Sequence, residues 1–142
     1  MKVYNGENML LGRLATRVAK SALLGEEIKV VNCEKIMVSG RKTNTFAHHK
    51  QRYDRRGYPL KSANHSRLPE RFVRRAIRGM LPWKQTRGKE AYKRIMCYKG
   101  IPGALENEKL ITLEDATFKK LPTLKYTTVG SVCKHLGGKT NE

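Results

Sequence analysis

The chain has 142 residues, of which 30% are charged and 39% are hydrophobic, and its formal net charge is +18. This balance favours a nucleic-acid-binding protein over a membrane protein or an enzyme for a small substrate. No apolar run is long enough to predict a transmembrane helix, and residues 1–12 lack the apolar core of a signal peptide. Three widely spaced cysteines without an export signal predict reduced thiols in a cytosol.

Hydrophobic periodicity and turn residues predict the secondary structure along the chain. In chain order, we expect strand 2–5, helix 9–24, strand 28–32, strand 36–40, helix 43–53, a polar loop over 57–69, helix 69–81, helix 85–93, strand 95–98 and helix 129–136. Gly25 and Gly137 are predicted to end the helices before them, and Thr128 to cap the last helix. Strands that alternate with helices predict α/β architecture with a mainly parallel sheet. No linker or repeat divides the chain, so we expect a single domain over 1–142.

The predicted helix 69–81 has an arginine face, and residues 71–81 contain no acid. Four arginines fall within an arc of roughly 100°, and the opposite side is apolar. These two sides are Arg71, Arg74, Arg75 and Arg78 against Phe72, Val73, Ala76, Ile77 and Met80. Like charges at this spacing repel one another, so a polyanion is expected opposite the face. Pro69 and Glu70 start the helix, and Gly79 and Pro82 stop it.

Residues 41–94 carry most of the positive charge. They contain seventeen Lys and Arg against three acids, a net charge of +14, whereas the rest of the chain carries +4. Because phosphate contacts dominate nucleic-acid affinity, the contact surface is predicted to lie in this segment.

Several stretches resemble other kinds of site. The strand, glycine turn and basic start at 38–43 fit either a phosphate-holding turn or a plain turn. Residues 137–140 lack the first glycine and the following helix of a P-loop. His48 and His49 have no cysteine at ligand spacing, so we predict surface or RNA-facing imidazoles and no zinc or other metal site. Cys97 paired with His135 could imitate a nucleophile and base, but its apolar strand predicts a buried thiol.

Three stretches resemble the ribosomal protein L13 family of the large subunit. They are GRLATRVAKSALLGE with VNCEKIMVSG (12–26 and 31–40), RRAIRGMLPWKQTRGKEAYKRIMCYKGIP (74–102) and KYTTVGSVCKHLGG (125–138). The segments RGMLPWK and YKGIP resemble the archaeal and eukaryotic branch. The chain lacks both the bacterial His-Pro-His ending and the eukaryotic C-terminal extension, so an archaeal-type member is the best match.

The resemblance implies a three-layer α/β/α fold with a four-stranded, mainly parallel sheet. It implies a structural, non-catalytic protein in the cytoplasm that binds large-subunit rRNA, helps subunit assembly and lies beside neighbouring large-subunit proteins. No cofactor, membrane or small-molecule substrate is expected.

The matching motif and the charge distribution together predict the RNA-binding residues. Positions in the motif select Arg74, Arg75, Arg78, Lys84 and Arg87. Basic charge in the remaining segment adds Arg41, Lys42, Lys50, Arg52, Arg55, Arg56, Arg67 and Arg71. Trp83 is equally suited to stack on a base or to pack on the protein.

Two other function classes remain open. A double-stranded DNA-binding protein would need a recognition helix, but no helix-turn-helix or zinc pattern is evident. An RNA-modifying or nucleotide-dependent enzyme would need a cofactor loop or an acid–base pair, and the sequence shows neither.

Overall fold

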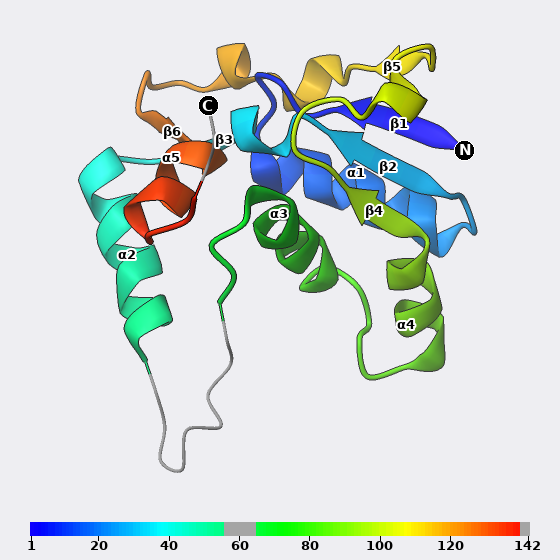
Figure 1. Cartoon of the computed structure of the whole chain (residues 1–142), viewed down its shortest axis with the longest axis horizontal. Coiled ribbons are helices and arrows are strands. Elements are labelled where there is room, and N and C mark those ends of the chain that lie inside the picture. Colours follow the sequence, from blue (N-terminus) through cyan, green and yellow to red (C-terminus); the bar gives the residue numbers. More distant parts are fainter. Residues whose placement is uncertain (56–64, 140–142) are drawn as a thin grey trace.

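The computed structural model describes residues 1–55 and 65–139, and Figure 1 shows how their helices and strands are arranged. The elements are β1 (Lys2–Asn5), α1 (Leu11–Leu23), β2 (Ile28–Val31), η1 (Cys33–Lys35), β3 (Met37–Ser39), α2 (Lys42–Asp54), α3 (Pro69–Arg78), α4 (Thr86–Lys93), β4 (Ile95–Cys97), η2 (Gly103–Leu105), β5 (Leu110–Ile111), η3 (Glu114–Ala116), η4 (Phe118–Lys120), β6 (Tyr126–Thr128) and α5 (Val129–His135). Arg56 and most of the expected loop over 57–69 lie outside the described residues.

A four-stranded parallel sheet in the order β4-β2-β1-β5 organises the fold. The helices α1 and α3 pack on one side of it. On the other side, Leu105 of the short helix η2 packs against Val3 and Val31. This arrangement confirms the expected α/β fold with helices on both sides of a four-stranded parallel sheet.

Three strands, β3, β5 and β6, differ from the prediction. The predicted strand at 36–40 forms β3, but it lies outside the four-stranded sheet and pairs antiparallel with β6. The amide of Gly40 continues this pairing by donating to the carbonyl of Lys125, at 2.8 Å. The fourth strand of the parallel sheet is instead β5, which pairs with β1. The sequence analysis missed both β5 and β6.

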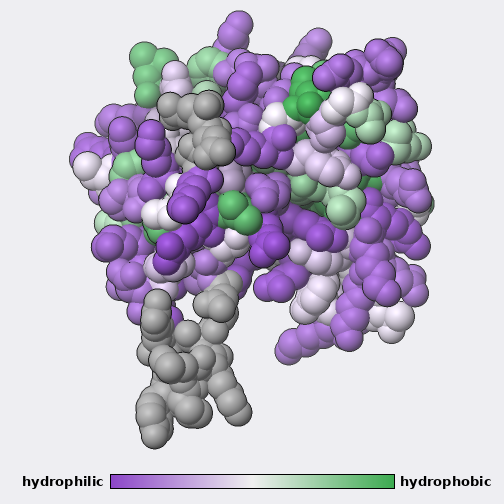
Figure 2. All heavy atoms as spheres, in the orientation of Figure 1, coloured by the Kyte–Doolittle hydropathy of each residue, from purple (hydrophilic) through white to green (hydrophobic). Residues whose placement is uncertain are grey.

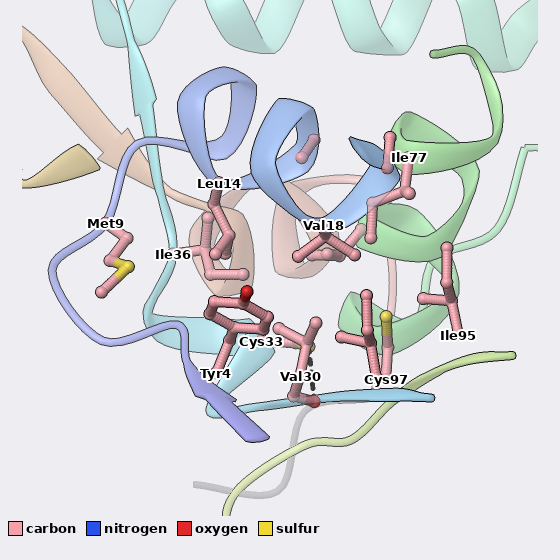
Figure 3. Packing of buried hydrophobic residues seen from close by; sticks show 14 of the residues in the cluster. Tyr4, Met9, Leu14, Val18, Val30, Cys33, Ile36, Ile77, Ile95 and Cys97 are labelled. Atoms are coloured by element: carbon pink, nitrogen blue, oxygen red, sulfur yellow. Dashed lines mark hydrogen bonds between the residues drawn. The ribbon is translucent and has the colours of Figure 1, made fainter. Parts of the chain in front are cut away.

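The main core lies between the sheet and helices α1 and α3 (Figure 3). Tyr4 and Val30 of the sheet point toward Leu14 and Val18 of α1, with Ile77 of α3 beside them. Each fully buried aliphatic side chain of this kind contributes about 1.5–3 kcal/mol to folding. The basic helix α3 is therefore fixed to the protein by its apolar side.

Most predicted helix boundaries are confirmed within a few residues. Gly25 and Gly137 follow α1 and α5 with φ angles of +96° and +83°, a conformation that favours glycine. The Thr128 hydroxyl accepts a hydrogen bond from the amide of Ser131 at 3.2 Å, as expected of an N-cap. The helix expected over 69–81 is shorter and ends at Arg78.

All three cysteines are buried as free thiols. Cys33 donates a hydrogen bond of 3.6 Å to the carbonyl of Val30 (Figure 3). Burial raises the pKa of Cys133 to about 12, and nearby Glu70 adds to the shift. These thiols belong to the core, which confirms the prediction for Cys97.

Candidate nucleic-acid interface

Helix α3 carries the predicted arginine face, and the core holds it in place. Val73 and Ile77 are completely buried, so the helix has one fixed orientation about its axis. Arg71 is exposed, whereas the other three arginines are half-buried. The face is therefore a partly embedded surface rather than a row of side chains extended into water. Met80 does not belong to the apolar side as predicted, because it lies beyond the end of the helix and is 43% exposed.

Aromatic side chains from α4 and the preceding turn position two of these arginines. The Arg74 guanidinium lies 4.4 Å from the ring centre of Tyr92 and donates to the Tyr92 carbonyl at 3.4 Å. The Arg78 guanidinium lies 5.1 Å from the ring centre of Trp83. The Trp83 and Tyr92 rings meet edge to face, with centres 5.1 Å apart. We call Arg74, Arg78, Trp83 and Tyr92 the arginine–aromatic cluster.

The contacts of this cluster address whether Trp83 packs on the protein or is left to stack on a base. The indole packs on the protein through Tyr92 and Arg78, yet it remains 40% exposed. Packing on the protein is therefore observed, and base stacking stays a prediction. Cation–π contacts of this kind also reduce the number of orientations open to a guanidinium before any RNA binds.

The sharp stop after α3 comes from close packing of the turn on α4. A Cβ atom at Gly88 would lie 2.2 Å from the carbonyl oxygen of Pro82, so only glycine fits there. Gly79 has an ordinary helical φ of −63°, which means that it isn't needed for an unusual backbone angle. The turn holds Trp83 and the exposed Lys84 beside α3, and exposed Arg87 follows on α4.

Two depressions flank the ridge formed by Arg75 and Arg78. The first, of about 420 Å³, lies between α2 and α3, and we call it the α2–α3 hollow. It is lined by Leu11, His49, Arg52, His65, Ser66, Phe72, Arg75, Ala76, Arg78, Gly79 and Leu136. The second, of about 670 Å³, is here called the outer groove. It is lined by Tyr53, His65, Ser66, Arg71, Arg74, Arg75, Arg78 and Tyr92.

Positive charges crowd around these depressions. Burial lowers the pKa of Arg75, and the charges of Arg78 and Arg52 lower it further. His65 also has a lowered pKa, first because of burial and then because of Arg75 and Arg52. No Asp or Glu is among the described residues that line either depression. An anion placed here would relieve this repulsion. Figure 2 shows that hydrophilic residues cover most of this face of the molecule.

Arg67 has a structural role that its charge did not predict. Its guanidinium donates to the Tyr53 hydroxyl and lies 4.8 Å from the centre of that ring. Its carbonyl oxygen would be 2.4 Å from a Cβ atom at Gly138. The segment that precedes α3 is thereby packed between α2 and the end of α5.

The remaining predicted RNA-binding residues of α2 lie away from the ridge, except Arg52. Lys50 forms an exposed ion pair with Asp54 at 3.8 Å, and Arg55 is exposed at the end of the helix. Arg41 and Lys42, at the start of α2, line a separate depression with Tyr126. The structure thus brings Arg52 to the α3 ridge but leaves these four residues apart from it. Arg56 lies outside the described residues.

Sequence analysis missed three positions in this region, and it predicted His49 only as a surface or RNA-facing imidazole. His49 and His65 line the α2–α3 hollow, and Tyr92 orients Arg74. Gly88 leaves room for the Pro82 carbonyl of the turn, because it has no Cβ atom. Gly88, Ala91 and Tyr92 share one face of α4 at helical spacing, which is a signal that could have identified the face toward α3. The two histidines give no comparable signal, because the hollow forms only when α2 and α3 come together.

The alternative sites receive little support. The Gly40 amide is engaged with Lys125, so the turn at 38–43 lacks one of the donors that a phosphate-holding turn would use. His135 stacks on Phe46 with ring centres 4.3 Å apart. Within residues 1–55 and 65–139, no three His, Cys, Asp or Glu side chains gather as a metal site. In the same part of the chain, no helix is long and apolar enough to cross a membrane.

Comparison with known proteins gives one consistent result. The sequence profile described as Ribosomal protein L13 matches residues 1–104. A protein of Methanococcus maripaludis named large ribosomal subunit protein uL13 is 44% identical over 142 residues, which cover 98% of this chain and 99% of that protein. The protein of the same name from Archaeoglobus fulgidus is 41% identical over 136 residues, covering 95% and 86% of the two chains.

A third relative of that name, from Methanocaldococcus jannaschii, is 37% identical over 142 residues. All three relatives are archaeal, which agrees with the archaeal-type features of the sequence. A family profile over most of the chain and relatives of this identity over nearly all of it lead to one conclusion: the chain belongs to the ribosomal protein L13 family.

Proposed function

We propose that the chain is a structural component of the large ribosomal subunit that binds large-subunit rRNA and helps the subunit assemble. The names of its archaeal relatives support the placement in the large subunit. The observation that carries the rRNA-binding part is the Arg75–Arg78 ridge, where a core-anchored helix concentrates positive charge. Among the described residues, no acid lines the two depressions beside it.

The ridge and its neighbours form the centre of the proposed contact. Arg71, Arg75 and Arg78 bind phosphates, and Lys84 and Arg87 extend the basic surface beyond the turn. Arg74 contributes by positioning, because its guanidinium already contacts Tyr92. The exposed part of Trp83 is available to stack on an unpaired base.

The outlying basic residues form a wider, less ordered set of contacts in this proposal. The basic segment 41–94 faces RNA within a single domain, and the predicted contacts of α2 add electrostatic attraction at its rim. Neighbouring large-subunit proteins would lie against the faces that the rRNA leaves uncovered.

Binding to two nucleic acids tests the proposed function. Purified protein is titrated with a large-subunit rRNA transcript and with duplex DNA of matched phosphate concentration, over a series of salt concentrations. Because folded rRNA offers unpaired bases and a distinctive backbone shape, we expect tighter binding to rRNA at moderate salt. Equal affinity for both at every salt concentration would contradict an rRNA-specific function and favour general polyanion binding.

A further inference from the structure

The α2–α3 hollow differs chemically from the outer groove, although both share the Arg75–Arg78 ridge. The outer groove is lined mainly by cationic and aromatic side chains. The α2–α3 hollow also contains the apolar residues Leu11, Ala76 and Leu136. Its volume of 420 Å³ falls in the range of about 300–1,000 Å³ that small-ligand sites occupy.

Aromatic rings form part of this hollow. His49 of α2 and Phe72 of α3 meet at an interplanar angle of 64°, with ring centres 5.1 Å apart. Both rings are half-buried, so each leaves some surface toward the hollow. Burial lowers the pKa of His49, with further lowering by His48, Arg52 and His65, so the ring is predominantly neutral at neutral pH. A neutral imidazole beside a phenyl ring is a suitable surface for a flat aromatic ligand.

Cationic groups also line the same hollow. Arg52 comes from α2, and Arg75 and Arg78 come from α3, so both walls contribute positive charge. Burial lowers the pKa of Arg75, and the nearby charges of Arg78 and Arg52 lower it further. The hollow therefore combines apolar and aromatic lining residues with cationic ones that favour an anion.

We propose that the α2–α3 hollow binds one unstacked nucleotide of the RNA, with its base among His49, Phe72 and Ala76 and its phosphate on Arg75 and Arg78. The RNA backbone continues across the ridge into the outer groove. This inference rests on the proposed rRNA-binding function and adds a specific base-accepting site to it.

A nucleotide matches the hollow better than either of its parts alone. A free phosphate would satisfy the arginines and leave the aromatic surface unused. An apolar peptide would cover His49 and Phe72 but would bring no negative charge to the arginines that line the hollow. A base joined to a phosphate satisfies both, as in single-strand-binding sites that combine stacking with a basic groove.

The test compares decauridylate with a ten-residue ribose-phosphate oligomer that lacks bases. Two substitutions fill the hollow without removing positive charge. Ala76→Leu adds bulk from α3, and Gly79→Leu adds it at a position with helical φ, where a Cβ atom would be 3.4 Å from the Ala76 carbonyl. Ala47→Leu is the matched control, because Ala47 is exposed on α2 and does not line the hollow. Circular dichroism verifies that each variant is folded.

We expect the wild-type chain and Ala47→Leu to prefer decauridylate by at least about five-fold, the lower end of the effect of one stacked base. Ala76→Leu and Gly79→Leu should lose most of this preference and keep their affinity for the base-free oligomer. An unchanged preference in both folded filling variants would overturn the inference, because Trp83 would then account for the base contact.

The remaining outcomes also decide the question. Equal loss of affinity for both oligomers would overturn the inference, since the hollow would then hold only phosphates. Tighter binding of a decapeptide of alternating Glu and Phe, blocked by the same variants, would assign the hollow to a protein partner. Failure to bind either oligomer while the rRNA transcript is bound would reject the nucleotide site and leave the proposed function intact.

Discussion

The parallel sheet with α1 and the basic ridge on α3 differ in what their side chains contact. Side chains of the sheet core are almost completely excluded from solvent and contact other apolar groups. On the ridge, burial lowers the pKa of Arg75, and the like charges of Arg78 and Arg52 nearby lower it further. The core therefore provides the stability that lets α3 hold several like charges close together. Ile77 and Arg78 are adjacent in sequence, but Ile77 belongs to the apolar core and Arg78 to the basic ridge.

Removing core volume under α3 should have the largest effect on stability. Ile77→Ala deletes a completely buried side chain, and we expect the free energy of unfolding to fall by about 2–5 kcal/mol. Urea unfolding followed by circular dichroism measures this loss. Arg71→Ala, on the exposed side of the same helix, is the control and should change stability by less than about 0.5 kcal/mol. Similar losses of unfolding free energy in the two variants would contradict the distinction between the buried and the exposed side of α3.

Gly88→Ala should have the next largest effect, because the new Cβ atom would overlap the Pro82 carbonyl. We expect a loss of about 1–3 kcal/mol from the backbone shift that must follow. The same shift would displace Trp83, so its fluorescence emission should change. Gly12→Ala is the control, since a Cβ atom at Gly12 has open space on α1 and should be neutral or slightly stabilising. If Gly88→Ala leaves both the unfolding free energy and the Trp83 fluorescence unchanged, the turn does not depend on the close approach of Gly88 to Pro82.

The contacts of Arg74 sharpen the comparison within the arginine face of α3. Arg74→Ala removes the guanidinium from Tyr92, and we expect a loss of about 1 kcal/mol in unfolding free energy. Arg74→Lys should recover only part of this loss of unfolding free energy, because an ammonium group lacks the planar stacking surface. Chemical denaturation of the two variants beside Arg71→Ala provides the measurement. If Arg74→Ala and Arg71→Ala are equally stable, Arg74 is not held by the aromatic cluster.

The smallest expected effect is the pH dependence of stability that His49 and His65 of the α2–α3 hollow cause. Their lowered pKa values mean that the unfolded chain binds protons more readily than the folded chain. Their stabilising contribution is therefore complete above the ordinary value of 6.5 and is lost as the pH falls through 6.5 toward the lowered values.

Proton NMR of the imidazole signals would follow both groups. We expect the midpoints of His49 and His65 to lie below those of the urea-unfolded chain, and to rise when RNA phosphates bind nearby. Free-protein midpoints at or above the unfolded values would contradict the crowding of positive charge around the hollow.

Local sequence patterns predicted the parts of the fold that depend on periodicity. The apolar face of α1 and the split between Ile77 and its neighbouring arginines follow directly from helical spacing. β5 could not be recognised in the same way, since Leu110 and Ile111 alone are too short to show alternation. The pairing of β3 with β6, rather than with the parallel sheet, is a long-range choice that no local pattern encodes.

The candidate site was predictable in charge but not in arrangement. Helical spacing identified the arginines of α3, and the family resemblance identified a ribosomal protein rather than an enzyme, as family membership confirms. The contact of Arg74 with Tyr92 and the approach of Arg52 to Arg75 depend on how separate helices pack. Such contacts between distant segments become visible only in three dimensions.

The salt dependence of rRNA binding by two charge-matched double variants tests the central claim most directly. Arg75→Ala/Arg78→Ala removes two charges from the ridge, and Arg13→Ala/Arg17→Ala removes two exposed charges from α1. Both pairs leave the formal net charge equal, so a difference between them reports position. Circular dichroism and urea unfolding would first establish that both variants remain folded.

We expect the ridge variant to bind rRNA more weakly, with a slope of log K against log salt that is shallower by about 2, because each lost phosphate contact removes about 0.9. The α1 variant should keep a slope close to that of the unmodified chain. Equal slopes for the two folded variants would contradict the assignment of RNA binding to the α3 ridge and would mean that net charge alone drives the association.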